Sequence, residues 1–73
     1  MSPSRTITEE IVWHRADIAM PDSDETVLVR IDDEEEEPVW LGYHDGDRWL
    51  NVDGYPINAV ICWAKMPEGP VML

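Results

Sequence analysis

The chain has 73 residues and carries sixteen acidic side chains against five Lys and Arg, which gives a formal net charge of −11. This length fits one domain and excludes a multidomain enzyme with separate substrate and cofactor folds. The negative charge excludes ordinary binding to a nucleic-acid backbone, which needs clustered Lys and Arg. Hydrophobic residues make up 44% of the chain and include four tryptophans, which is enough for a small folded core.

The sequence predicts a flexible N-terminal arm over residues 1–10, followed by one small β-rich domain over residues 11–70. The arm carries Arg5 but no apolar stretch of the kind that signal peptides contain, and the apolar run 59–64 is too short to span a membrane. The single cysteine, Cys62, excludes an intramolecular disulfide and fits a reducing compartment. We therefore expect a cytoplasmic protein with no membrane partner.

The first expected element is a short helical turn. Residues 8–13 before it could cap this turn or instead lead into a short edge strand. Trp13–Ala19 has room for one or two turns of helix, and Pro21 would end them. We expect this segment to lie across one face of a β-sheet and to cover it.

Apolar and β-branched stretches separated by turn residues predict four strands. Asp45-Gly46 and Asp53-Gly54 mark two of the turns between them. The fold class expected is therefore α+β, a small antiparallel β-meander of about four strands with a short N-terminal helical turn packed on one face. The last strand is apolar on both faces, which predicts a central or covered position. The predicted strands are Thr26–Ile31, Val39–His44, Arg48–Val52 and Ala59–Lys65.

The most distinctive feature of the sequence is a run of six consecutive carboxylates between the first two predicted strands. Such runs usually keep a protein in solution, and the functional alternative is a surface that docks on a basic partner or imitates nucleic acid. Trp40 follows the run closely, and it is the tryptophan that we expect at the surface, whereas Trp13, Trp49 and Trp63 are expected in the core. Tryptophan is enriched among the side chains that dominate binding interfaces. The predicted partner-binding residues are Asp32, Asp33, Glu34, Glu35, Glu36, Glu37 and Trp40.

Other chemistries have weaker support in the sequence. Asp22-x-Asp24 and Asp45-x-Asp47 lack the further ligands of a calcium loop, and Cys62 with two histidines lacks the paired spacing of zinc sites. Cys62 also lies between apolar residues, which indicates an inert thiol rather than a catalytic one. We predict no catalytic residues, no metal site and no cofactor, and hence a protein that is not an enzyme.

Tryptophans, prolines, turn dipeptides and β-branched stretches follow one another in a distinctive order along the chain: Trp13, Met20-Pro21, Asp24–Val29, Gly42-Tyr43, Asp45-Gly46, Trp49, Asp53-Gly54, Pro56-Ile57 and Val60–Pro67. This order resembles that of a family of short proteins from phages and bacterial prophages, catalogued as a domain of unknown function. The resemblance covers about Trp13 to Pro70 and implies a phage or prophage setting in a bacterial host, and no catalytic residues carry over from the family. The chain departs from the family pattern at the acidic run, which is longer and more acidic than the usual loop.

Two functions follow as hypotheses. The first is a non-enzymatic acidic module that binds a basic host protein, in its extreme form as a nucleic-acid mimic that acts as an inhibitor. The alternative is a structural or assembly component that self-associates, for example as a homodimer, through an open strand edge.

Overall fold

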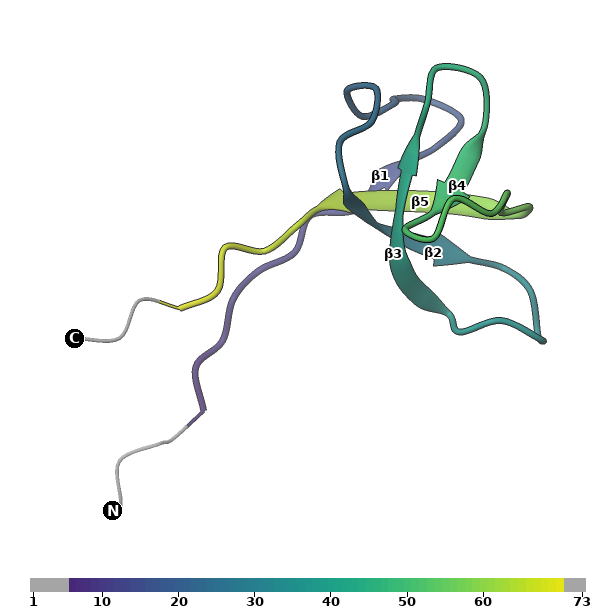
Figure 1. Ribbon diagram of the computed structural model, residues 1–73. Coiled ribbons are helices and arrows are strands. Elements are labelled where there is room, and N and C mark those ends of the chain that lie inside the picture. Colours follow the sequence, from purple (N-terminus) through teal and green to yellow (C-terminus); the bar gives the residue numbers. More distant parts are fainter. Residues whose placement is uncertain (1–5, 71–73) are drawn as a thin grey trace, which may run out of the picture.

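The computed structural model describes residues 6–70, which form one antiparallel β-sheet of five strands and no helix. β2, β3 and β4 form a meander, and β5 returns to lie between β2 and the short β1 (Figure 1). The predicted interior position of the last strand is therefore confirmed. The strands are β1 (His14–Arg15), β2 (Val27–Ile31), β3 (Val39–His44), β4 (Trp49–Asn51) and β5 (Val60–Lys65), in the order β1-β5-β2-β3-β4.

The expected α+β class and its N-terminal helical turn are wrong, because the fold is all-β. His14 and Arg15, near the start of the predicted helical segment, pair with Trp63 and Cys62 of β5. After them the chain makes only one turn, in which the backbone N–H groups of Ile18 and Ala19 donate to the carbonyl of Arg15. The segment therefore lies at the edge of the sheet rather than across its face.

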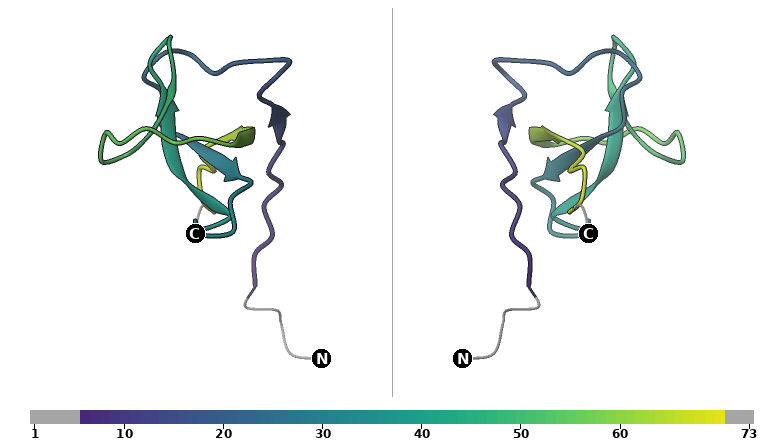
Figure 2. Two further views of the ribbon diagram at one scale, coloured as in Figure 1. Left: turned by 90° about the vertical axis from the view of Figure 1, so that its right-hand side faces the viewer. Right: turned by 90° about the vertical axis from the view of Figure 1, so that its left-hand side faces the viewer.

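The core lies on one side of this twisted sheet, where β3 runs at a steep angle to β5 (Figures 1 and 2). Side chains alternate along a strand, so Val27, Val29 and Ile31 of β2 share one face, and all three are buried. Trp63 stands directly opposite Val29 and joins the same cluster. The partly buried residues packed against it are Ala16, Trp49, Ile57 and Val60.

Gly42 allows β4 to approach this core closely. A Cβ atom at this position would lie 2.7 Å from the carbonyl oxygen of Leu50. Cβ atoms in proteins essentially never approach a neighbouring atom this closely. The glycine is required by space alone, because its backbone is not among those with positive φ.

The two terminal segments leave the sheet on the same side (Figure 1). The backbone N–H of Glu68 donates to the carboxylate of Glu9 over 3.2 Å, which holds the two segments together. Of the predicted arm, Met1–Arg5 lie outside the described residues, and residues 6–10 are exposed and belong to no strand.

Candidate functional site

The six carboxylates of Asp32–Glu37, here called the acidic loop, connect β2 to β3 and are all exposed. The loop is a compact turn, because the N–H of Glu36 donates to the carbonyl of Asp33 and the N–H of Glu35 to its carboxylate. Both ends are attached to the sheet. Ile31 donates to the carbonyl of Pro38, and Asp32 donates to the carbonyl of Ala59, each over 2.9 Å. The negative charge is therefore presented from a fixed position.

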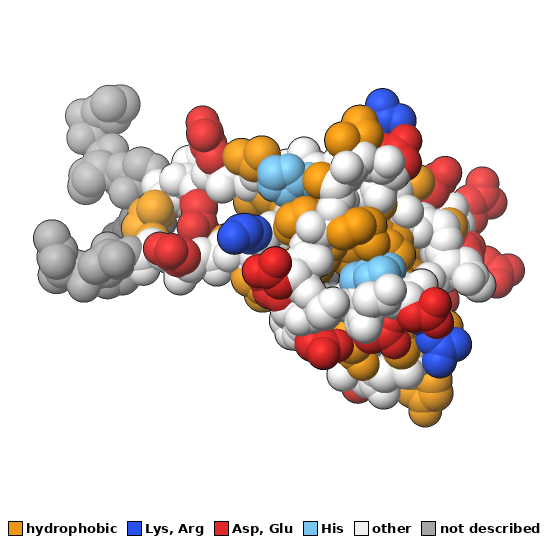
Figure 3. Space-filling view, turned by 90° about the horizontal axis from the view of Figure 1, so that it is seen from above, with side chains coloured by type: hydrophobic (Ala, Val, Ile, Leu, Met, Phe, Trp, Pro, Cys, Tyr) orange, Lys and Arg blue, Asp and Glu red, His pale blue; other side chains and the backbone are white. Residues whose placement is uncertain are grey.

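No basic side chain neutralises the acidic loop in the part of the chain that the structure describes. The ion pair found among residues 6–70 joins Arg15 to Asp17 over 2.7 Å, and both residues lie outside the acidic loop. Arg30 is next to the loop in sequence, but its guanidinium donates to the backbone carbonyl of Ile31. Figure 3 shows Asp and Glu side chains spread around an apolar area on one face, with few Lys or Arg among them. The loop is thus free to meet an external cation.

Trp40 lies beside the acidic loop, on the same face of the sheet as the core. It stands opposite Val29 in the register between β2 and β3. Its 48% exposure is the largest of the four tryptophans, against 39% for Trp13 and 5% for Trp63. The predicted surface position of Trp40 is confirmed, as is the burial of Trp63, whereas the expected core position of Trp13 is wrong.

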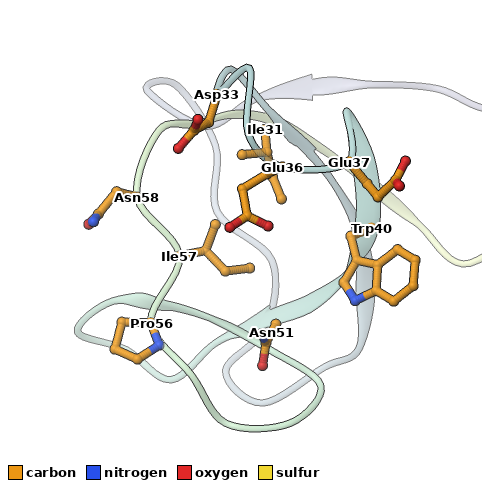
Figure 4. Close-up of a pocket in the computed structure, with 9 residues that line it drawn as sticks. All are labelled: Ile31, Asp33, Glu36, Glu37, Trp40, Asn51, Pro56, Ile57 and Asn58. Atoms are coloured by element: carbon orange, nitrogen blue, oxygen red, sulfur yellow. The ribbon is translucent and has the colours of Figure 1, made fainter.

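A recess of about 310 Å³ lies between the acidic loop, Trp40 and the segment that leads into β5. In Figure 4 the carboxylate of Glu36 points into this recess toward Ile57, whereas that of Glu37 points away from it. Ile31, which is 3% exposed, and Ile57 give the recess an apolar floor. Its lining residues are Ile31, Asp33, Glu36, Glu37, Trp40, Asn51, Pro56, Ile57 and Asn58.

Sequence reasoning missed the wall of the recess that Pro56, Ile57 and Asn58 supply. This wall is placed by pairing to β4, since Leu50 bridges to Pro56 and the N–H of Ile57 donates to the carbonyl of Trp49. The sequence predicts that residues 55–58 are irregular or form a brief pairing, and the pairing is confirmed, but their place beside the acidic loop depends on contacts made across the fold. The recess therefore brings together four of the predicted site residues, Asp33, Glu36, Glu37 and Trp40, and leaves Asp32, Glu34 and Glu35 outside.

The histidines and the cysteine do not come together. Cys62 stands opposite Arg15 on β1 and opposite Arg30 on β2. By the alternation of side chains, His14 and His44 lie on the other face, the face of Val29 and Trp63. A thiol–imidazole pair or a shared zinc site is therefore excluded by the register. Among residues 6–70, no group of three or more His, Cys, Asp or Glu is placed to hold a metal ion.

The carboxylate of Asp45, in the turn between β3 and β4, has a lowered pKa. The backbone N–H groups of Arg48 and Asp47 donate to its carboxylate, each over 2.9 Å, and they lower the pKa of Asp45 below its ordinary value of 3.8. Both bonds lie within the turn between β3 and β4, so the shift reflects the geometry of the turn rather than a reactive site.

No helix within residues 6–70 is long and apolar enough to cross a membrane. Comparison with known proteins finds no match: no family model matches the chain, and the searches of curated proteins and of solved structures return none.

Proposed function

We propose that this protein is a non-enzymatic acidic interaction module that binds the basic surface of a host protein. The observation that carries the proposal is the acidic loop, whose six exposed carboxylates have no basic partner among the described residues. Complementary charge speeds the encounter between two proteins and suppresses wrong partners. The half-exposed indole of Trp40 beside the loop adds apolar contact area of the kind that dominates binding interfaces.

The proposed setting is the cytoplasm of a bacterial host that carries a phage or prophage. The support is the resemblance of Trp13–Pro70 to short phage proteins. Such a module would act by occupying a basic site on host machinery, and imitation of nucleic acid is the extreme form of the proposal. The turn at Asp33–Glu36 favours docking of a basic segment over imitation of the regular spacing of phosphates.

Self-association through a strand edge has less support. The apolar β5 is interior, and the sheet edges are the two-residue β1, the three-residue β4 and residues Val39–Leu41 of β3, which extends beyond β4. The outer side of β4 is already paired, because Asn51 and Trp49 form backbone hydrogen bonds with Tyr55 and Ile57. Two copies of the chain could pair only through such short stretches, and each copy carries a net charge of −11, so repulsion opposes self-association.

The test is capture of proteins from a bacterial lysate with the immobilised protein, followed by measurement of affinity for each purified protein retained. A variant with Glu34–Glu37 changed to Gln should lose its partners, because it removes most of the loop charge. The matched control removes four charges elsewhere, at Asp22, Glu25, Asp47 and Asp53, none of which makes a side-chain hydrogen bond or ion pair within the described residues. Equal binding by the two variants would contradict the proposal.

A further inference from the structure

The recess beside Trp40 combines three surfaces that suit different parts of one basic side chain. Ile31 and Ile57 form an apolar floor, the indole of Trp40 forms one side, and the carboxylate of Glu36 points in from the acidic loop (Figure 4). A long basic side chain places its aliphatic stem on apolar surface and keeps its charged head near polar groups. No Lys or Arg of the described chain lines the recess, so its charge is complementary to a cation from outside.

The strand that borders the recess also has an open edge. β4 pairs only with Gly42–His44 of β3, so Val39–Leu41 has no strand partner on the side away from β2 in the described chain. Extended peptides add to such edges through backbone hydrogen bonds while their alternate side chains enter pockets. The occupant favoured by this arrangement is a segment of a protein rather than a free small cation.

We propose that the recess binds one arginine side chain from an extended segment of the partner protein. The planar guanidinium stacks on the indole of Trp40 and donates two parallel hydrogen bonds to the carboxylate of Glu36. Lysine lacks the planar head and binds the same place as a point charge, so it is the weaker occupant. This inference rests on the proposed function and adds to it the chemistry that the site recognises.

The test uses the peptide acetyl-Gly-Ser-Xaa-Ser-Gly-amide, in which Xaa is arginine, lysine or citrulline. Binding is followed by nuclear magnetic resonance through the indole N–H signal of Trp40, assigned with the variant Trp40→Phe. Trp63, whose indole N–H donates to the carbonyl of Ala19 over 2.8 Å, serves as the internal reference for an intact fold. The arginine peptide should shift the Trp40 signal. Lysine should weaken binding about fivefold and citrulline about tenfold or more, because they lack the planar head and the charge respectively.

Two variants of the acidic loop separate the recess from the bulk charge of the loop. Glu36→Gln should weaken the arginine peptide about tenfold, whereas Glu35→Gln, which removes the same charge from a residue outside the recess, should change it less than about twofold. Equal losses in the two variants, equal binding of arginine and citrulline, or an unmoved Trp40 signal would each overturn the inference. If the capture of partners still depends on the acidic loop in that case, the proposed function stands and only the arginine site is rejected. If neither experiment depends on the loop, both proposals fail.

Discussion

At the scale of single residues, Trp63 connects the core of the sheet to the loop that follows β1. Its ring is 5% exposed and lies against the imidazole of His14, with ring centroids 4.6 Å apart. Its indole N–H donates to the carbonyl of Ala19 over 2.8 Å. One side chain therefore both fills the core and supplies a polar contact that keeps the turn after Arg15 against the sheet.

The variant Trp63→Phe should lower the free energy of unfolding by about 2 kcal/mol, because it leaves a cavity and an unpaired carbonyl. Urea denaturation with an unchanged slope would measure the loss. The matched control is Trp40→Phe at the 48% exposed position, which should change stability by less than about 0.5 kcal/mol. Equal effects at the two positions would show that the burial of Trp63 does not stabilise the fold.

Trp13 is exposed, and its residue type alone does not predict this position. A tryptophan in a short chain is usually needed in the core, and this reasoning alone predicts a core position for Trp13. His14 instead stands opposite Trp63, so its neighbour Trp13 is turned away from the core face. Which of two adjacent residues faces inward is decided by the register with β5, and the local sequence holds no information on that register.

At the scale of elements, the four strands with β-branched and apolar residues were predictable to within about one or two residues at each end. A short edge strand near β1 could be suggested only as an alternative to a helical turn, because the two residues of β1 have no strand preference and are extended through pairing with β5. The acidic loop and Trp40 could be identified from the sequence since both lie in one continuous stretch. The recess could not, because its far wall around Ile57 comes from another part of the chain.

The turn between β3 and β4 makes stability depend on pH through Asp45. Folding lowers the pKa of Asp45 through the N–H groups of Arg48 and Asp47, so the charged carboxylate is favoured in the folded state. Its stabilisation is complete well above the unfolded pKa of about 3.8 and is lost as the pH falls through the lower folded pKa. Asp45→Asn keeps the acceptor oxygen but not the charge.

We expect Asp45→Asn to have a lower melting temperature than the unmodified protein at pH 7, and we expect the difference to shrink steadily below about pH 4. Asp45→Ala should lose the acceptor as well, and it should stay less stable than Asp45→Asn at every pH. Thermal unfolding between pH 2 and 7 would measure both. A difference between the unmodified protein and the Asp45→Asn variant that is constant with pH would contradict the role given to the charge.

At the scale of the whole molecule, the net charge of −11 is carried mostly by loops and turns around a small apolar core. Among the described residues one ion pair, Arg15–Asp17, offsets part of it, and this pair is exposed. Exposed pairs of this kind contribute little to stability. Repulsion between the remaining carboxylates therefore opposes folding, although the consecutive charges of the acidic loop also repel each other in the unfolded chain.

Added salt should for this reason raise the melting temperature, because the range of repulsion shortens to about 8 Å at physiological ionic strength. Thermal unfolding at neutral pH in increasing NaCl would measure the rise. The variant with Glu34–Glu37 changed to Gln should show a smaller rise than the unmodified protein. A melting temperature that falls between low and moderate salt would contradict the repulsion argument.

The contact between Glu9 and Glu68 has a consequence for the use of this domain in larger polypeptides. The chain enters and leaves the sheet at nearly the same place, since the N–H of one residue reaches the carboxylate of the other over 3.2 Å. A domain with adjacent entry and exit points can be inserted into a surface loop of another protein without separating the ends of that loop. The same proximity suits the domain to circular permutation, with new ends opened at the exposed turn of Asp53-Gly54.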